Sequence, residues 1–404
     1  MHGEKIPMSE VRDQYEAYPY PERRPRDEKT RLIVGSPSLP QEIDHFVFGG
    51  QRDWTQPLRI LVAGGGTGDG LIQLTALLTQ FGRPYEATYI DLSRASRKIA
   101  EERARVRKLR NISFVTGSLL EAADHGPFDY IDCCGVLHHL PEPDAGFAAL
   151  RAALAPGGGL GFMVYAPYGR SGVYPLQAAF GALTHGMSPP ERLKFGRRIY
   201  DTLPDGHPMK CNPNLNDHES GDAGFYDLLM HSQDRAYTVA ELNAALTRTG
   251  WALSGFTVPI LYDLQRFAPV PDGMDMVQSM DLAEKLNGTL RTHTGYAVAD
   301  GSPAGPAHGG HRTLIPHLKG VQPGQLAKHV AQGKPPRLDT DGVAGTLDLP
   351  RETAPLLAAI NGRRTLTEIA ATTGCDPIRF GALWTPIERA LTAWGLLLYS
   401  GILR

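Results

Sequence analysis

The chain has 404 residues, enough for two or three domains, and its 41 Lys and Arg against 43 Asp and Glu leave a formal net charge of −2. Such a balance disfavours an obligate nucleic-acid partner, for which a strongly basic domain is expected. No window approaches ~18 uncharged apolar residues, and the four cysteines form neither a C-x-x-C pair nor a disulfide framework, so we expect a cytoplasmic protein with no membrane partner.

The N-terminal stretch carries a cluster of tyrosines. Residues 9–26 begin as a short capped helix and end as an extended segment that prolines stiffen. Tyr15, Tyr18 and Tyr20 lie in this stretch. Their amphipathic rings could anchor an arm to the rest of the protein, or they could form a lid whose ring faces attract a bound cation. The sequence leaves both interpretations open.

A glycine-rich turn follows the first predicted strand. The apolar run from Ile60 to Ala63 stops at Gly64, and apolar residues at helical spacing resume at Leu71, so 58–81 reads as strand, tight turn and helix. Glycines at 64, 66 and 68 give the pattern G-x-G-x-G, which is neither the dinucleotide pattern G-x-G-x-x-G nor a phosphate-binding loop. The main chain can therefore approach a ligand closely without forming a pyrophosphate site.

A carboxylate marks the end of the second predicted strand. Residues 86–91 end at Asp91, which stands 23 positions after Gly68. In nucleotide-binding α/β folds an acid about 20 residues after the glycines meets the ribose hydroxyls. A carboxylate can accept both hydrogen bonds of a vicinal diol, so Asp91 is a candidate ribose ligand.

Strands and helices alternate through the first half of the chain. The predicted strands are 58–63, 86–91, 111–116, 127–133 and 158–165, and the predicted helices are 69–81, 93–107 and 143–155. Strands separated by helices pair in parallel through right-handed crossovers. We therefore predict an α/β fold with a doubly wound, mostly parallel sheet, whose ligand lies at the carboxyl ends of the strands.

The fourth predicted strand is followed by Gly135 and the segment Leu-His-His-Leu-Pro. His138 and His139 therefore appear where the ligand pocket is expected. Either histidine could act as a general base, since imidazole accepts protons near neutral pH, or it could orient the loop through hydrogen bonds to the main chain.

Together, the glycine turn, Asp91, the fourth strand and its histidine pair resemble class I S-adenosylmethionine-dependent methyltransferases over about residues 55–165. The Gln-Tyr-Glu-x-x-Pro-Tyr-Pro pattern of the arm is similar to the segment before the domain in one bacterial subgroup. The resemblance implies S-adenosylmethionine as cofactor, with a Rossmann-like fold. The cofactor-binding residues that we expect are Tyr15, Tyr20, Gly64, Gly66, Gly68, Asp91, Leu92, Ser118, Leu119 and Gly135.

The sequence departs from this family at two positions. Val62 stands where an acidic residue often precedes the glycine turn, so holding the cofactor's ammonium falls to another group. Ser118 stands where an acid commonly accepts from the adenine amino group, although a hydroxyl can also accept.

Residues 166–236 interrupt the pattern and are predicted to form an inserted helical cap that binds the methyl acceptor, with helices near 173–185 and 189–203. Thr238 is expected to cap helix 239–248, and strand 251–258 to return to the sheet. The candidate catalytic residues are Tyr18, His138, His139, His231 and Asp234. The candidate substrate-binding residues are Tyr165, Arg170, Tyr174, Arg235 and Tyr237. A salt-bridged junction around Asp234 and Arg235 is an equal alternative.

The last third of the chain is predicted as a loop-rich connector, 266–335, and a small α+β domain, 336–404. Four histidines (His293, His308, His311 and His317) lack acidic or cysteine partners at ligand spacing, so no metal site is predicted. In the tail, Thr365 and Glu368 form a predicted capping box, and helix 380–394 with strand 396–399 completes a module that resembles winged-helix and peptide-recognition domains. Its near-neutral charge favours a protein or peptide partner, or a homodimer interface, over DNA.

We therefore expect four parts: an arm or lid at 1–54, a methyltransferase domain at 55–265, the connector and the winged-helix-like module. The predicted function is S-adenosylmethionine-dependent methyl transfer to a nitrogen or oxygen, with a protein or peptide as leading acceptor. The alternatives are a small-metabolite methyltransferase and a non-catalytic cofactor-binding scaffold.

Overall fold

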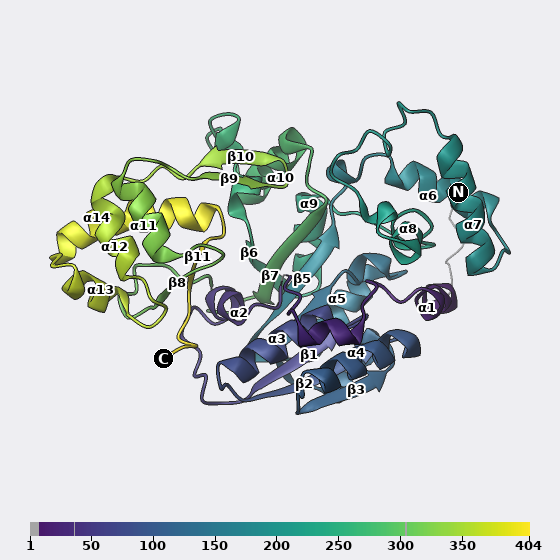
Figure 1. The fold of residues 1–404 in the computed structure, drawn as a ribbon, viewed down its shortest axis with the longest axis horizontal. Coiled ribbons are helices and arrows are strands. Elements are labelled where there is room, and N and C mark those ends of the chain that lie inside the picture. The colour runs from purple at the N-terminus through teal and green to yellow at the C-terminus, as the bar shows by residue number, and fades with distance from the viewer. Residues whose placement is uncertain (1–7, 36, 304) are drawn as a thin grey trace.

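A computed structural model describes residues 8–35, 37–303 and 305–404 (Figure 1). At its centre lies a seven-stranded sheet in the order β3-β2-β1-β4-β5-β7-β6. The strands are β1 (Leu58–Ala63), β2 (Tyr85–Asp91), β3 (Ile112–Thr116), β4 (Phe128–Cys134), β5 (Leu154–Tyr165), β6 (Trp251–Phe256) and β7 (Thr292–Ala299). Strands β1 to β5 pair in parallel, and β7 runs antiparallel to both β5 and β6.

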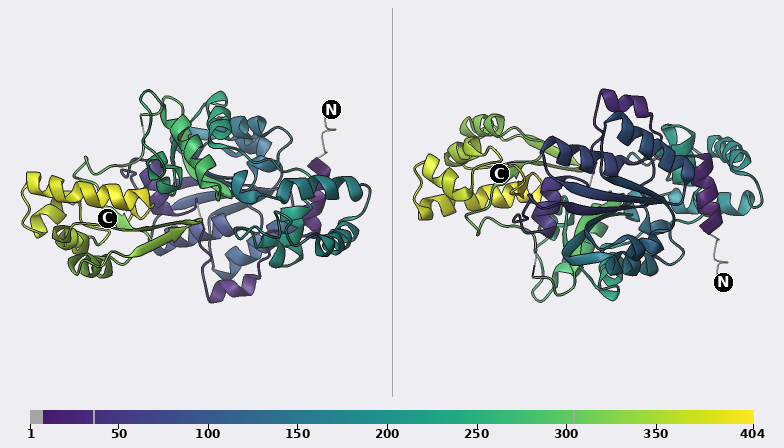
Figure 2. Two further views of the ribbon diagram at one scale, coloured as in Figure 1. Left: turned by 90° about the horizontal axis from the view of Figure 1, so that it is seen from above. Right: turned by 90° about the horizontal axis from the view of Figure 1, so that it is seen from below.

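Helices cover both faces of the sheet (Figure 2). One face packs against α2 (Pro40–Val47), α3 (Asp69–Gln80) and α4 (Arg94–Val106), through a core that includes Ile43, Leu74 and Ala100. The other face packs against α5 (Pro143–Ala152) and α9 (Val239–Arg248), through a core that includes Phe147 and Leu242. The predicted α/β class with a doubly wound, mostly parallel sheet is confirmed.

The sheet extends further along the chain than the sequence indicated. Strand β7 and helix α10 (Met276–Asn287) both form within the stretch expected to be a loop-rich connector. β7 carries two threonines and a histidine before its short apolar run, which hides its burial. His293 is fully buried in β7, where Tyr262 Oη lies 3.0 Å from its Nδ1 and the main-chain oxygen of Tyr237 lies 2.8 Å from its Nε2.

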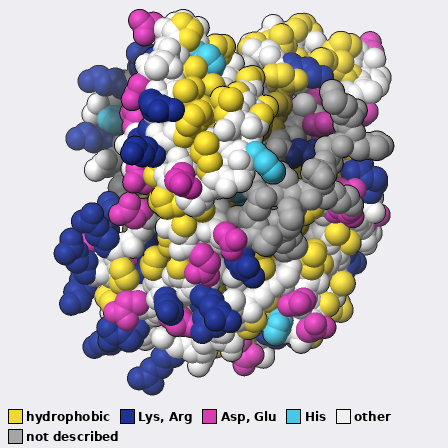
Figure 3. All heavy atoms as spheres, turned by 90° about the vertical axis from the view of Figure 1, so that its right-hand side faces the viewer, with side chains coloured by type: hydrophobic (Ala, Val, Ile, Leu, Met, Phe, Trp, Pro, Cys, Tyr) yellow, Lys and Arg dark blue, Asp and Glu magenta, His cyan; other side chains and the backbone are white. Residues whose placement is uncertain are grey.

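Residues 166–236 form a separate helical layer beside the carboxyl ends of the strands (Figure 1). It contains α6 (Val173–Leu183), α7 (Pro189–Thr202) and α8 (Asp222–Leu229), which share a core built from residues such as Phe180 and Phe225. The N-terminal helix α1 (Met8–Ala17) contacts α7 and α4, so the arm bridges this layer and the sheet domain. Figure 3 shows the face that lies on the right-hand side of Figure 1. On this face, Lys and Arg side chains gather toward one edge, with acidic side chains among them.

The C-terminal module has its own hydrophobic core. Its elements are β8 (Pro316–Leu318), α11 (Pro323–Ala331), β9 (Arg337–Thr340), β10 (Val343–Thr346), α12 (Ala354–Ala359), α13 (Leu366–Thr372), α14 (Pro377–Ala393) and β11 (Leu397–Tyr399). Because β11 pairs with β8, the packed unit includes residues before 336. Asp44 of α2 accepts from Ser400 Oγ over 2.7 Å and from the Gly401 N–H over 3.0 Å, which ties the C-terminal segment to the sheet domain.

None of the helices that the described residues form combines the length and apolar character needed to cross a membrane.

The capping box predicted at the start of α13 is present. The Glu368 N–H donates to Thr365 Oγ1 over 3.1 Å, and the Thr365 N–H donates to Glu368 Oε2 over 2.6 Å. Thr365→Ala removes the acceptor for one orphan amide, so we expect it to lower the free energy of unfolding of the C-terminal module by about 1 kcal/mol. Thr365→Ser keeps the hydroxyl and is the control. Denaturant unfolding measures both, and equal losses in the two variants would contradict the capping argument.

Candidate functional site

A cavity of about 490 Å³ opens at the carboxyl ends of β1, β2 and β4. This volume lies in the range of about 300–1,000 Å³ that is typical of small-molecule sites. Twelve of the predicted site residues line it: Tyr15, Tyr20, Gly64, Gly66, Asp91, Leu92, Ser118, Leu119, Gly135, His139, Tyr165 and Arg170. The sequence therefore located the cavity, and the structure brings the arm, the sheet and the insertion together around it.

The glycine turn forms one wall of the cavity. Gly66 has a φ of +51°, and a Cβ at this position would stand 2.9 Å from the main-chain oxygen of Tyr20. The arm therefore crosses directly over the turn, where Thr67 Oγ1 donates to the Pro21 oxygen over 2.7 Å. A side chain at position 66 would collide with the arm, which explains why a glycine stands there.

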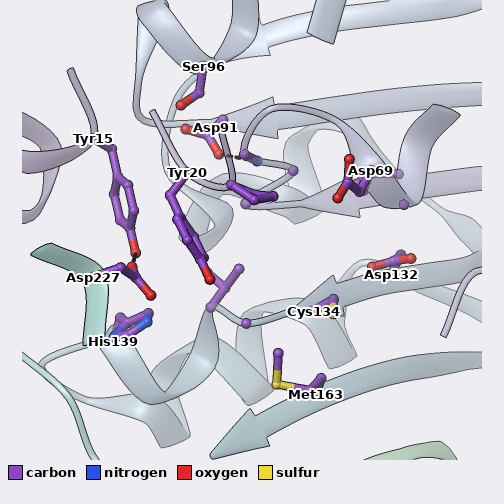
Figure 4. A pocket seen from close by; sticks show the side chains of 18 of the residues that line it. Tyr15, Tyr20, Asp69, Asp91, Ser96, Asp132, Cys134, His139, Met163 and Asp227 are labelled. Atoms are coloured by element: carbon purple, nitrogen blue, oxygen red, sulfur yellow. Dashed lines mark hydrogen bonds between the residues drawn. The ribbon is translucent and has the colours of Figure 1, made fainter. Parts of the chain in front are cut away.

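Asp91 is held in place by main-chain amides. The Gly66 N–H donates to Asp91 Oδ2 over 2.8 Å, and the Ser93 N–H donates to Asp91 Oδ1 over 2.8 Å (Figure 4). Burial raises the pKa of Asp91 above its usual value, and the two amides oppose that shift. A carboxylate oriented in this way can accept two further hydrogen bonds, as a vicinal diol requires.

Asp69, at the start of α3, is neutralised by two arginines. Arg23 reaches it over 2.6 Å and Arg103 over 2.7 Å. Burial opposes the shift, but the arginines hold the pKa of Asp69 below its usual value. Arg103 also pairs over 2.7 Å with Glu28, and both side chains are almost fully buried. The two arginines therefore neutralise the Asp69 carboxylate, which leaves little negative charge to attract a ligand.

Asp132 is a cavity residue that the sequence analysis did not select. It lies in the middle of β4 beside Val62 of β1, in register with it, and accepts a hydrogen bond from the Ser38 hydroxyl. Burial raises its pKa to about 6, and no Lys or Arg in the described part of the chain pairs with it. The signal in the sequence was an acid within the otherwise apolar run of residues 130–134.

Asp227 of α8 is a second cavity residue that sequence reasoning missed. Tyr15 Oη donates to its Oδ1 over 3.1 Å, and Tyr165 Oη donates to its Oδ2 over 3.3 Å. Figure 4 shows Asp227 below Tyr15 and next to His139, on the opposite side of the cavity from Asp132. The signal was again a single acid inside an apolar stretch, residues 225–230.

The main chain of Gln233 fixes the tautomers of two histidines. His139 Nδ1 lies 2.9 Å from the Gln233 oxygen, which can only accept, so Nδ1 carries the proton and Nε2 keeps its lone pair. The Gln233 N–H donates to His231 Nδ1 over 3.1 Å, so the proton of neutral His231 lies on Nε2, 3.3 Å from Tyr15 Oη. Burial holds the pKa of His231 well below its usual value, which keeps it neutral.

The remaining predicted site residues lie outside the cavity lining. Gly68 begins α3 with a φ of +101° and packs on Ala100, and Tyr18 stacks on Tyr226 with ring centroids 5.2 Å apart. Asp234 forms an ion pair with Arg170 over 3.1 Å, and Tyr174 Oη accepts from Arg170 Nε over the same distance. Arg235 is exposed and lies 3.8 Å from Glu241, whereas Tyr237 is buried. His138 and His231 are also buried, and their rings contact that of His139.

Asp234 and Arg170 therefore form a buried ion pair behind the cavity wall. Their side chains are 0% and 3% exposed, and the Arg170 guanidinium lies 3.6 Å from the ring centroid of Tyr165. This geometry matches the alternative of a salt-bridged junction for Asp234, although its ion-pair partner is Arg170 rather than Arg235. Arg170 positions Tyr165, which in turn contacts Asp227.

Two groups of side chains in this region have metal-ligand chemistry: His138, His139 and Asp234, and His139, Asp227 and His231, with ligand atoms within 4.8 Å of one another in each. The rings of His139 and His231 stack with centroids 3.8 Å apart and planes 16° apart. Because lone pairs of parallel rings run side by side, they do not converge on one ion. In the group of His139, Asp227 and His231, this stacking favours hydrogen bonding over chelation.

Residues 61–160 match a family model described as a methyltransferase domain. The match supports the predicted domain and, with it, S-adenosylmethionine as the expected cofactor. The chain is 34% identical over 205 residues to an uncharacterized protein of Synechococcus sp. The aligned residues make up 49% of this chain and 48% of that protein. The chain therefore spans about half the length of this curated relative.

Solved structures of PKMT2 from Rickettsia typhi, alone and in complex with AdoHcy, share the fold. Both are 13% identical to this chain and cover 90% of it and 76% of their own length, with TM-scores of 0.60 and 0.59. At this identity the likeness concerns the fold alone.

Proposed function

We propose that this chain is an S-adenosylmethionine-dependent methyltransferase that acts on a nitrogen or oxygen, with a protein or peptide side chain as leading acceptor. The observation that carries the proposal is Asp91, held by the amides of Gly66 and Ser93 at the edge of a cavity of about 490 Å³ within the matched domain. When bound, the cofactor supplies a methyl group on a sulfonium, whose neutral leaving group needs no general acid.

The cavity lining fits the adenosine part of this cofactor. Asp91 would accept from the ribose hydroxyls, and Leu92 and Leu119, after β2 and β3, offer apolar surface to a purine. The Leu120 N–H donates to Ser118 Oγ over 3.2 Å, so the Ser118 hydroxyl hydrogen is left to donate to a ring nitrogen. Serine can therefore replace an acid here with a different hydrogen-bond pattern.

Asp132 is our candidate for holding the cofactor's ammonium. Val62 cannot do so, but the strand register places Asp132 directly beside Val62, and both line the cavity. Asp69, on the same side, is already paired with Arg23 and Arg103. An ammonium that leaves water needs an anionic partner. Asp132 is a buried carboxylate that accepts a hydrogen bond from the Ser38 hydroxyl and forms no ion pair within the described part of the chain.

We expect Asp132→Asn to weaken binding of S-adenosylhomocysteine about tenfold, because it removes one charge-assisted hydrogen bond. Methylthioadenosine, which lacks the amino-acid part, should bind the variant and the parent protein equally. Calorimetry with both ligands measures the difference. An equal loss for the two ligands would contradict the assignment of Asp132 to the ammonium.

The same assignment predicts a pH dependence. The pKa of Asp132 is raised to about 6, so its carboxylate is present above that pH and is lost as the pH falls through it. Affinity for S-adenosylhomocysteine should therefore decrease between pH 7 and pH 5 more than affinity for methylthioadenosine does. Parallel titrations of the two ligands over this range test the sign.

Calorimetry with S-adenosylmethionine, followed by label transfer in lysate with and without protease treatment, tests the proposed function. Absence of binding would contradict it. Binding without label transfer would favour the non-catalytic scaffold. Label that becomes protease-sensitive supports a protein or peptide acceptor, whereas label that stays in the small-molecule fraction supports a metabolite acceptor.

A further inference from the structure

The part of the cavity opposite Asp132 contains a buried carboxylate that has no Lys or Arg ion-pair partner in the described residues. Asp227 is 4% exposed, and among the described residues no Lys or Arg forms an ion pair with it. The arginine of this region, Arg170, is committed to Asp234 over 3.1 Å. Burial raises the pKa of Asp227, and nearby His139, the Tyr15 hydrogen bond and Arg170 oppose that shift without reversing it.

The hydrogen bonds to Asp227 come from neutral hydroxyls, so they orient the carboxylate without neutralising its charge. Tyr15 and Tyr165 each donate one hydrogen bond, to different carboxylate oxygens, at 3.1 and 3.3 Å. Each oxygen can accept a second hydrogen bond, because a carboxylate offers about four lone-pair sites. The tyrosines therefore orient the carboxylate and leave acceptor capacity on the cavity side.

The surrounding surface is aromatic. Tyr15, Tyr20 and Tyr165 all line the cavity, and Figure 4 shows the Tyr15 and Tyr20 rings side by side above Asp227 and His139. Tyrosine faces attract a cation, and the attraction grows when the cation is desolvated. Because the Arg170 guanidinium already lies 3.6 Å from the Tyr165 ring centroid, the rings that would meet a cation near Asp227 are those of Tyr15 and Tyr20. A buried carboxylate near such rings suits an ammonium better than it suits a neutral hydroxyl or another anion.

A proton acceptor lies beside the carboxylate. A ring nitrogen of His139 lies within 4.8 Å of Asp227, and the Gln233 oxygen leaves the His139 Nε2 lone pair available. An ammonium cannot attack a methyl group until it has lost a proton. The site therefore combines a group that binds the charged amine with a group that can deprotonate it.

On the basis of the proposed function, we propose that the methyl acceptor is an alkyl amine that enters as an ammonium and is bound by Asp227. His139 Nε2 takes one of its protons. The amine nitrogen then forms a bond to the methyl carbon as the bond from that carbon to sulfur breaks, and the electron pair of that bond stays on sulfur. The product is a methylated ammonium, and the proton on His139 passes to solvent.

The test uses the full chain loaded with S-adenosylhomocysteine and two probes of equal length, n-hexylamine and n-hexanol, at pH 7.5, where the amine is protonated. Ligand-detected NMR titration measures both dissociation constants. We expect the amine to bind about tenfold more tightly than the alcohol, and Asp227→Asn to abolish that difference while S-adenosylhomocysteine binds as before.

Asp222→Asn, an exposed position on the same helix, is the matched control and should keep the preference for the amine. Equal binding of amine and alcohol, no binding of the amine, or an unchanged preference in Asp227→Asn would each overturn the proposal. Failure of the parent protein to bind S-adenosylhomocysteine would instead count against the proposed function. The two results are therefore distinguishable.

Discussion

Asp91→Ala is expected to weaken binding of S-adenosylhomocysteine by about 100-fold or more. In the proposed site the variant would lose two charge-assisted hydrogen bonds to the ribose, each worth about 1.5–3 kcal/mol, and about 1.4 kcal/mol corresponds to a factor of ten. It also removes the carboxylate that accepts from the Gly66 and Ser93 amides, so the glycine turn loses its anchor. Calorimetry measures the change directly.

Asp91→Asn separates these two contributions. Asparagine keeps one carbonyl oxygen that can accept from a main-chain amide, but it cannot accept on both sides of its side chain. We expect an intermediate loss of affinity together with an unfolding temperature close to that of the parent protein. Full affinity in both variants would contradict the ribose assignment, whereas unfolding of both would leave Asp132→Asn as the independent test of the cofactor site.

The sequence was sufficient for the half of the fold that carries the glycine turn. In that region the apolar runs are continuous and the turns contain glycine. Helix α4 also has a side-chain cap, because Ser93 Oγ accepts from the Ser96 N–H over 3.0 Å. In that region the secondary structure that the residues favour locally is also the one that tertiary packing requires. The positions at the carboxyl ends of the strands could therefore be placed near one another before any contact was known.

Strand β7 shows why the remainder was harder to predict. It lies between β5 and β6 in the sheet, although more than 120 residues of chain separate it from β5. Its buried histidine is satisfied by Tyr262 and by the Tyr237 oxygen, two contacts that only the tertiary structure supplies. A polar residue that is buried through long-range hydrogen bonds has no periodic pattern, so sequence reasoning assigned this segment to a loop.

The site residues that were missed share one property. Asp132 and Asp227 are single acids inside apolar runs, whereas the two acids selected from the sequence were Asp91, at a strand end, and Asp234, in a polar segment. Burying an acid without a cation costs free energy. We therefore expect such an acid to bind a ligand or to take part in a hydrogen-bond network. In the cavity, the half-buried Asp91 accepts from main-chain amides, the buried Asp132 from a hydroxyl, and the buried Asp227 from two tyrosines.

His139→Gln is expected to lower the rate of methyl transfer by about 100-fold to 10,000-fold, the usual range for loss of a positioned general base. In the parent protein the Gln233 oxygen holds the Nδ1 proton of His139 and leaves Nε2 free to accept a proton. Glutamine can still donate to that oxygen, so the local structure should persist, but its amide is too weakly basic to take a proton from an amine or hydroxyl.

The initial rate of tritium transfer from labelled S-adenosylmethionine into the acceptor fraction measures this effect, with calorimetry of S-adenosylhomocysteine on the same variant. We expect the rate to fall while cofactor affinity stays within about twofold, because the expected loss concerns the transition state and not the bound cofactor. His185→Gln changes an exposed histidine of the insertion and serves as the matched control. A parent-like rate in His139→Gln would exclude His139 as the base. Loss of rate and cofactor affinity together would show that His139 supports the pocket rather than the proton transfer.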